Sequence, residues 1–186
     1  MKGKNVLKLR YVRVDKNDTS RGNRTYAEVP IEARCRLVVD GFNDLEALDG
    51  MLRKDAATLS LEGQSWIFQV CASKGWIIRR GDVSSAFLSG QFFTREVYVV
   101  APAKGFPAVG DWPAYPPGTI FKLRKSVPGL GDAVREWETE HISGLIEVGF
   151  QESSVTKSLF LFYRNDKLEG IIGTHVDDDF GGGSKW

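Results

Sequence analysis

The chain has 186 residues, which suits one domain or most of a larger one, and its 42% hydrophobic and 26% charged residues are ordinary for a globular protein. With 25 basic and 24 acidic residues the formal net charge is +1, which by itself favours neither nucleic acid nor a membrane surface as a partner. No apolar run is long enough to cross a bilayer, so we expect no transmembrane helix and no membrane partner. Cys35 and Cys71 lie outside any CxxC or Cys/His cluster, and nothing suggests a zinc site.

The first part of the chain predicts two strands and a helix. "VLKLRYVRV" and "YAEVPIEARCRLVVDGF" contain alternating apolar residues on either side of a long polar turn. "DLEALDGMLRKDA" is ambiguous. A helix is predicted to begin after the N-cap Ser60 and to end at Gly75. Its apolar face, which we expect to pack in the core, comprises Trp66, Ile67, Val70 and Cys71.

The middle of the chain predicts short strands separated by irregular segments. "WIIRRGDVSSAFLSG" indicates a strand, a break and a helical turn, and "REVYVVAP" and "IFKLRKS" indicate strands. The segment between these two strands is rich in Pro and Gly, which is typical of a loop. A second helix should end near Gly149. Its helical spacing rests on Val134, Trp137, His141, Ile142, Leu145 and Val148.

The last part predicts a hairpin that ends in three consecutive aspartates. "SLFLFYR" and "LEGIIGTHV" flank the turn "NDK", and "DDDFGGG" follows. Strands and helices without regular alternation indicate the α+β class.

Carboxylates at two predicted strand ends are the candidate chemistry. Asp82 follows one strand, and Asp177 and Asp178 follow another. If these side chains converge, they offer the hard oxygen ligands that Mg²⁺ prefers. The residues alone leave two other interpretations open. One is a solvated polar turn. The other is a Ca²⁺-binding acidic turn, which three consecutive aspartates fit poorly because that site needs oxygen ligands at alternating positions.

Five segments resemble, in the correct order, the reverse transcriptase domain of Ty1/copia-type long-terminal-repeat retrotransposons. "ARCRLVVDGF" is similar to that family's "KARLVARGF", "GWIIRRGDVSSAFLSG" to "GW.L.QLDVKNAFLNG", and "EVYVVAPAKGF" to "EVYMEQPPGF". "FKLRKSVPGLGDAVREW" resembles "CRLKKALYGLKQAPRAW", and "THVDDDF" stands where the family has "YVDDML". The resemblance covers most of the chain, from about Leu7 to Phe180.

The resemblance implies a fold and a function. The fold would be a polymerase palm, a ferredoxin-like antiparallel sheet with packed helices, in residues 75–186, and a fingers-like portion with an N-terminal hairpin in residues 1–74. The function would be RNA-directed DNA polymerisation, with an RNA/DNA primer-template and a dNTP as partners, inside a cytoplasmic particle. Asp82, Asp177 and Asp178 would hold two Mg²⁺ or Mn²⁺ ions that act on the primer 3′-hydroxyl and the leaving pyrophosphate.

The resemblance also implies a nucleotide site. Phe87 would select deoxynucleotides as a steric gate, and Arg36 would contact the triphosphate. Backbone amides around Ser85 and Ala86 could hold phosphate. Asp179, at an apolar position of the family pattern, is expected to be a solvated neighbour of the site.

Departures from the pattern favour an alternative function. Asp40 replaces a basic residue, His175 replaces Tyr, and the segment "VPGLGDAV" differs from its counterpart at Pro128, Gly131, Asp132 and Val134. The chain also stops soon after the paired aspartates, so we expect a fragment of fingers and palm that is incomplete at its C-terminus. The alternative is a truncated, inactive remnant with at most weak nucleic-acid binding, and we expect little or no polymerase activity from the isolated chain.

Overall fold

The computed structural model describes residues 4–184, which form two compact units, each built from two stretches of chain. The first unit comprises the described residues up to Leu52 and Phe93–Gly131, and the second comprises Arg53–Phe92 and the described residues from Asp132 onward. These limits differ from the single boundary after residue 74 that the resemblance implied, because the chain returns to the first unit after Phe92. The labels fingers and palm remain predictions.

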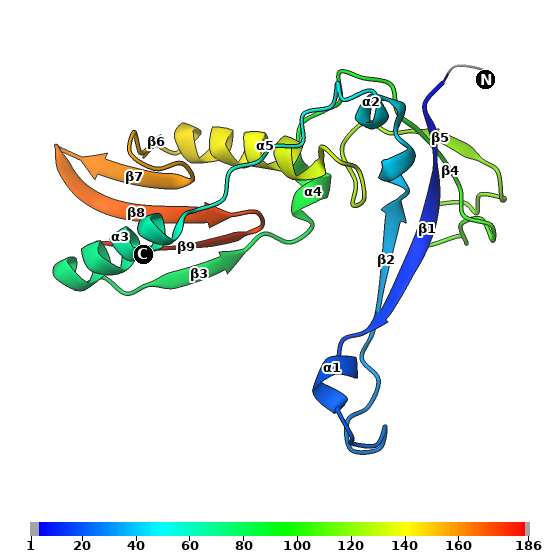
Figure 1. The fold of residues 1–186 in the computed structure, drawn as a ribbon, viewed down its shortest axis with the longest axis horizontal. Coiled ribbons are helices and arrows are strands. Elements are labelled where there is room, and N and C mark those ends of the chain that lie inside the picture. The colour runs from blue at the N-terminus through cyan, green and yellow to red at the C-terminus, as the bar shows by residue number, and fades with distance from the viewer. Residues whose placement is uncertain (1–3, 185–186) are drawn as a thin grey trace. The chain divides into compact units, whose positions relative to one another are not determined.

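The first unit contains a four-stranded sheet with the order β2-β1-β4-β5 (Figure 1). The strands are β1 (Val6–Asp15), β2 (Ala33–Val39), β4 (Tyr98–Val100) and β5 (Ile120–Lys122). The helical turns are α1 (Asp18–Arg21), η1 (Gly41–Asn43) and α2 (Leu45–Leu48). β1 runs antiparallel to β2 and parallel to β4, where Leu7 and Val99 pair and are both buried. The two predicted N-terminal strands are therefore confirmed, and the ambiguous segment contains the short α2.

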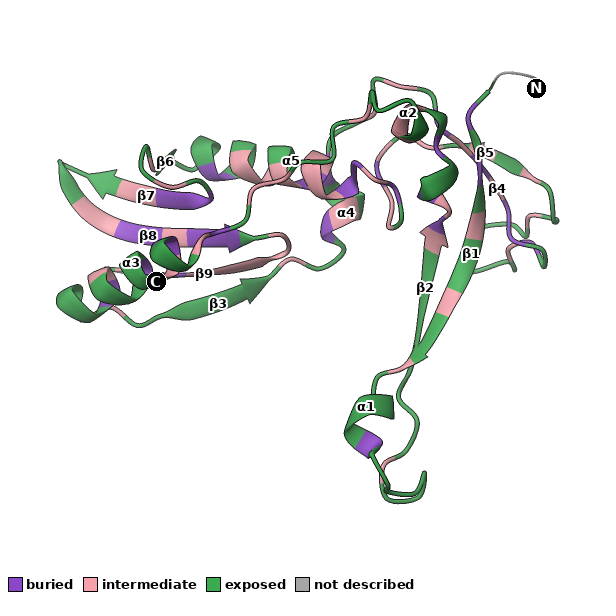
Figure 2. Cartoon of the chain, viewed as in Figure 1, coloured by how far each residue is buried: buried purple, intermediate pink, exposed green. Residues whose placement is uncertain are grey.

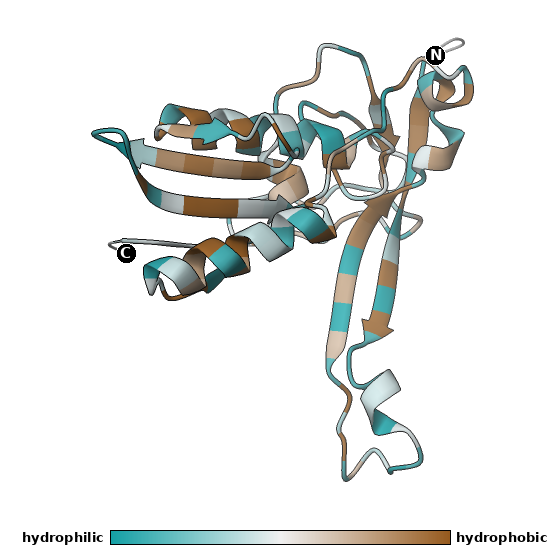
Figure 3. Cartoon of the chain, turned by 60° about the vertical axis from the view of Figure 1, so that its left-hand side comes forward, coloured by the Kyte–Doolittle hydropathy of each residue, from teal (hydrophilic) through white to brown (hydrophobic). Residues whose placement is uncertain are grey.

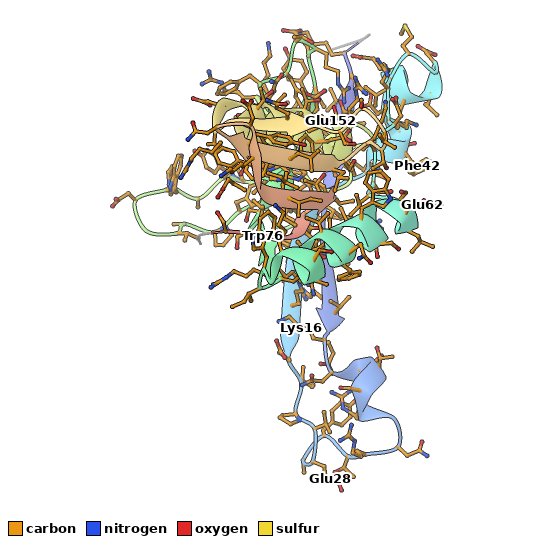
Figure 4. The ribbon with its side chains drawn as sticks, turned by 90° about the vertical axis from the view of Figure 1, so that its left-hand side faces the viewer. Lys16, Glu28, Phe42, Glu62, Trp76 and Glu152 are labelled. Carbon is orange, nitrogen blue, oxygen red and sulfur yellow. The ribbon has the colours of Figure 1, made fainter. Side chains whose placement is uncertain are left out.

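Beyond β4, β1 and β2 form a two-stranded hairpin that is exposed on both faces (Figure 2). Hydrophilic and hydrophobic bands alternate along both strands, as the sequence pattern predicted (Figure 3). An ion pair between Lys16 and Glu32 joins the strand ends, and Glu28 lies farther along the connecting segment (Figure 4). Within that segment, Arg21 is buried against Asp15, so the tip of the hairpin has a small polar core of its own.

The second unit contains a fully antiparallel five-stranded sheet with the order β3-β9-β8-β7-β6. The strands are β3 (Arg79–Asp82), β6 (Phe150–Glu152), β7 (Leu159–Arg164), β8 (Lys167–His175) and β9 (Asp178–Gly183). The helices are α3 (Leu61–Lys74), α4 (Ala86–Ser89) and α5 (Ala133–Glu147). The mixed composition of the two units confirms the α+β class.

Local signals define the ends of these elements. The Ser60 side chain accepts a hydrogen bond from Gly63 N–H, and Gly75 ends α3 in the left-handed conformation, as predicted. The β7–β8 turn places both Asn165 and Asp166 at positive φ, the arrangement of a type I′ hairpin.

Helices cover both faces of this sheet. α3 packs on the face that contains Leu159 and Ile171, where its own Ile67 and Cys71 complete a buried cluster. α5 packs on the other face, because Asp179 and Phe180 point to opposite faces and contact α5 and α3 respectively. The predicted apolar face of α3 is thus only partly core: Ile67 and Cys71 are buried, whereas Trp66 is 49% exposed.

The strand β9 was not predicted, because glycine is rare in strands. Its glycines are required by close packing within the second unit. A Cβ atom on Gly181 would collide with the carbonyl oxygen of Ile171, and one on Gly182 would lie 2.8 Å from Cys71 Sγ. The three aspartates therefore do not end a strand: Asp177 lies in the turn between β8 and β9, and Asp178 and Asp179 begin β9. No helix within residues 4–184 has the length and apolar character needed to cross a membrane.

Candidate active site on the β3, β8 and β9 strands

The sheet of the second unit brings two distant aspartates side by side. Asp82 ends β3 and is the cross-strand partner of Asp178, the first residue of β9. Directly paired residues of an antiparallel sheet present their side chains on one face, with Cβ atoms about 5 Å apart. Asp177 immediately precedes β9, and its carbonyl oxygen accepts a hydrogen bond from Val83 N–H at 2.9 Å. Backbone pairing alone therefore places the predicted triad at one end of the sheet.

A two-residue turn presents Asp177. Because His175 pairs with Asp178, Val176 and Asp177 form the whole connection between β8 and β9. Val176 has φ 60°, which a β-branched residue seldom adopts. Trp137 of α5 donates its indole N–H to the Val176 carbonyl at 2.7 Å. His175 itself is exposed next to the acidic residues, which is compatible with its expected position beside the site.

Arg80 forms an ion pair with Asp178, one of the candidate metal ligands. Its Nη2 lies 2.8 Å from both carboxylate oxygens of Asp178, and its Nε lies 3.2 Å from Oδ1. The hydrogen bond to Asp178 raises the pKa of Arg80 above its usual value, and the charges of Asp82 and Asp177 raise that pKa further. Asp178 thus bonds the guanidinium of Arg80 directly, whereas Asp82 and Asp177 attract it through their negative charges. Arg80 is not among the residues predicted from the sequence, although its two-residue spacing from Asp82 on a strand was an available signal.

The carboxylate oxygens of this site are the right type of ligand for a hard divalent cation, but the side chains do not lie close enough together to bind one. Carboxylate oxygens are what Mg²⁺ or Mn²⁺ would use, and they already attract a cation here. Within residues 4–184, however, no three His, Cys, Asp or Glu side chains lie close enough together to hold a metal ion as they stand. Asp178 would have to exchange Arg80 for the metal.

Asp179 is not the solvated neighbour that the sequence suggested. Its side chain is only 15% exposed and lies 3.0 Å from Nε2 of His141, which is 16% exposed. The His141 ring stacks on Trp137, with centroids 4.9 Å apart. Alternation along β9 turns Asp179 toward α5, so a polar pair fills a position that is apolar in the family pattern. We call Trp137, His141 and Asp179 the support cluster.

The predicted nucleotide-binding residues lie in both units. Ser85 has φ 58° and precedes the single turn of α4, where Ala86 is buried and Phe87 is half-buried. These three residues follow Asp82 closely in the second unit. Arg36 lies on the hairpin of the first unit, and its role in binding a triphosphate stays a prediction.

Two of the altered positions have local structural roles. Asp132 is 3% exposed at the N-terminus of α5, where a negative charge is favourable, so its carboxylate is withdrawn from the surface. Asp40 accepts a hydrogen bond from the Asn43 side chain beside η1. The altered "VPGL" segment packs against the end of β2, where Pro128 O accepts from Val39 N–H. The hydrogen bond from Asn43 gives Asp40 a local role that does not involve nucleic acid.

Comparison with known proteins shows the family of the chain. The model of the reverse transcriptase (RNA-dependent DNA polymerase) family matches residues 3–185. The retrovirus-related Pol polyproteins from transposons RE2 and RE1 of Arabidopsis thaliana are 33% and 32% identical over 145 residues, or 78% of this chain. The chain spans 9% of the length of each. No solved structure matches it. The chain belongs to the reverse transcriptase family, as a domain of the copia type.

Proposed function

We propose that this chain is the polymerase part of a copia-type reverse transcriptase and adds deoxynucleotides to a primer 3′-end. The observation that carries the proposal is the pairing of Asp82 with Asp178 across β3 and β9, with Asp177 in the adjoining turn. A solvated polar turn would not require an aspartate that is distant in sequence as its neighbour.

We further propose that Asp82, Asp177 and Asp178 hold two divalent ions, Mg²⁺ or Mn²⁺. Such ions stabilise the charge on the attacking and leaving oxygens of a phosphoryl transfer. The three aspartates would fix the positions of the ions, and the two-residue turn at Val176 limits the conformational freedom of Asp177. Phe87 would limit the space next to the sugar, and the amides near Ser85 and Ala86 would bind phosphate. These roles are supported by family membership.

Nucleic-acid binding has independent support in the first unit. The register of β1 and β2 places four basic side chains on one face of the hairpin, and we call this its cationic face. The cationic face comprises Lys8, Arg10, Arg34 and Arg36. It contains no acidic residue within the paired strands, so it suits a phosphate backbone even though the net charge of the chain is near zero.

Non-catalytic nucleic-acid binding is the second candidate. It is favoured by the polar Asp179 at an apolar family position and by Arg80 on Asp178. In this case the cationic face would be functional while the aspartates would not gather metal.

Single-nucleotide incorporation on poly(rA)–oligo(dT) with Mg²⁺ or Mn²⁺ separates the two candidates. The polymerase proposal predicts incorporation that falls at least about 100-fold on Asp178→Asn, because a metal ligand is lost. Asp166→Asn, in the β7–β8 turn of the same sheet, is the matched control and should retain activity. Primer-template binding without any incorporation by the folded chain would favour the second candidate.

A further inference from the structure

Arg80 is placed to act on the candidate metal site although it carries no ligand atom for a cation. We propose that Arg80 competes with the divalent ion for the carboxylate of Asp178, so that metal binding requires displacement of the guanidinium. This inference rests on the proposed metal site, and it assigns Arg80 the role of a residue that sets metal affinity.

Strand geometry supports a specific contact. Arg80 and Asp82 are two residues apart on β3 and share a face with Asp178, whereas Arg79 points to the opposite face. The Arg80 guanidinium bonds both oxygens of Asp178, which are the atoms that a metal would need. The guanidinium uses a lone pair on each of these oxygens, and its positive charge repels a second cation at the same carboxylate, so the contact opposes metal binding while it persists.

The exposure of Arg80 makes the contact reversible. The Arg80 side chain is 72% exposed, while that of Asp178 is 34% exposed, so the guanidinium can turn into solvent without breaking the core. When no metal ion is bound, the negative charges of Asp82 and Asp177 help to keep the guanidinium beside Asp178. The same charges contribute to the raised pKa of Arg80.

Direct Mn²⁺ titration of the full chain, followed by electron paramagnetic resonance of the free ion, tests the proposal. Arg80→Gln should lower the Mn²⁺ Kd about two- to five-fold, the range expected when an exposed ion pair no longer competes. Arg79→Gln removes the same charge from the same strand but from the other face, and it should change Kd less than Arg80→Gln. Arg80→Lys keeps the charge but loses the forked geometry of the guanidinium, so its Mn²⁺ Kd should lie between those of Arg80→Gln and the unmodified chain.

The outcomes separate this inference from the proposed function. If Arg79→Gln and Arg80→Gln lower the Mn²⁺ Kd equally, the effect is one of general charge, and the proposed competition by Arg80 is wrong. If the unmodified chain binds Mn²⁺, Asp82→Asn weakens binding and Arg80→Gln changes nothing, then the proposed metal site stands and the role of Arg80 is wrong. If no folded variant binds Mn²⁺, both proposals fail. Far-ultraviolet circular dichroism checks that each variant is folded.

Discussion

Val176 is a strained residue beside the candidate site. A β-branched side chain at positive φ costs of the order of 1–3 kcal/mol. The strain is held in place by the β8–β9 pairing and by the Trp137 indole, which bonds the Val176 carbonyl. The turn therefore keeps its shape at the expense of stability.

Val176→Gly should raise the free energy of unfolding by about 1 kcal/mol, because glycine adopts positive φ without steric cost. Val12→Gly is the matched control: Val12 lies in β1 without positive φ, so glycine there should lower stability by about 0.5–1 kcal/mol. Urea unfolding measures both. Equal destabilisation by the two changes would show that the Val176 backbone is not strained.

The support cluster predicts coupling between two distant residues. His141→Leu or Asp179→Leu alone should lower the free energy of unfolding by about 1–3 kcal/mol, because each change leaves the other polar side chain largely buried and without its partner. The double variant should cost less than the sum of the single variants, because an apolar pair can replace a buried polar pair. A double-mutant cycle in urea gives the coupling. Additive costs would mean that the two side chains do not interact.

Some single residues could be assigned from sequence and others could not. Asp82, Asp177 and Asp178 could be proposed as a triad because they lie in two recognisable motifs, and the β3–β9 pairing places them near one another, while their role stays a prediction. Asp179 was misread because its partner His141 lies 38 residues earlier, on a helix whose packing no local pattern reveals. The role of Arg80 depends on the β3–β9 register, which sequence spacing alone does not determine.

At the scale of elements, capped helices were predictable and glycine-rich strands were not. α3 has an N-cap serine and a terminal glycine, and both signals proved correct. β9 depends on how closely it approaches β8 and α3, which is a property of the folded unit. β6 is a three-residue strand that depends on pairing with β7.

Gly181→Ala should destabilise the second unit by about 1–3 kcal/mol, because the new methyl group would collide with the backbone of β8. Gly81→Ala is the control in the neighbouring β3, where a Cβ would meet no heavy atom within 4 Å. Thermal unfolding should show a lower Tm for the first variant only. A similar Tm for both would contradict the close β8–β9 approach.

The hairpin tip should lose stability in acid. The hydrogen bond from Arg21 holds the pKa of Asp15 below its usual value of 3.8, so the ionised form is favoured in the folded state. This contribution is full at pH values above about 3.8 and is lost as the pH falls through the lower folded value. Amide hydrogen exchange of residues 15–32 between pH 5 and pH 2.5, corrected for intrinsic rates, should show the loss. Asp15→Asn should remove this pH dependence.

At the scale of the whole molecule, sequence motifs were sufficient to identify the family but not the division into units. The order of the five motifs predicted a copia-type reverse transcriptase domain, and the family comparison confirmed it. The two discontinuous units depend on long-range strand pairing, which a motif order does not contain.

The cationic face predicts how primer-template binding responds to salt. Arg36→Gln should reduce the slope of log Kd against log salt concentration by about 0.9, the value for one lost phosphate contact. Arg13→Gln, on the opposite face of the same hairpin, should change it less. Fluorescence anisotropy at several KCl concentrations measures the slopes. Equal slopes for both variants would place phosphate contacts elsewhere.

The parallel pairing of β1 with β4 has a consequence for how the chain folds during synthesis. β1 is made first, yet its partner β4 is made only after Arg53–Phe92 of the second unit. The first sheet therefore waits for a late, long-range contact, which folds slowly and leaves the edge of β1 open meanwhile. Early strands that wait for late partners are the segments a chaperone would need to protect.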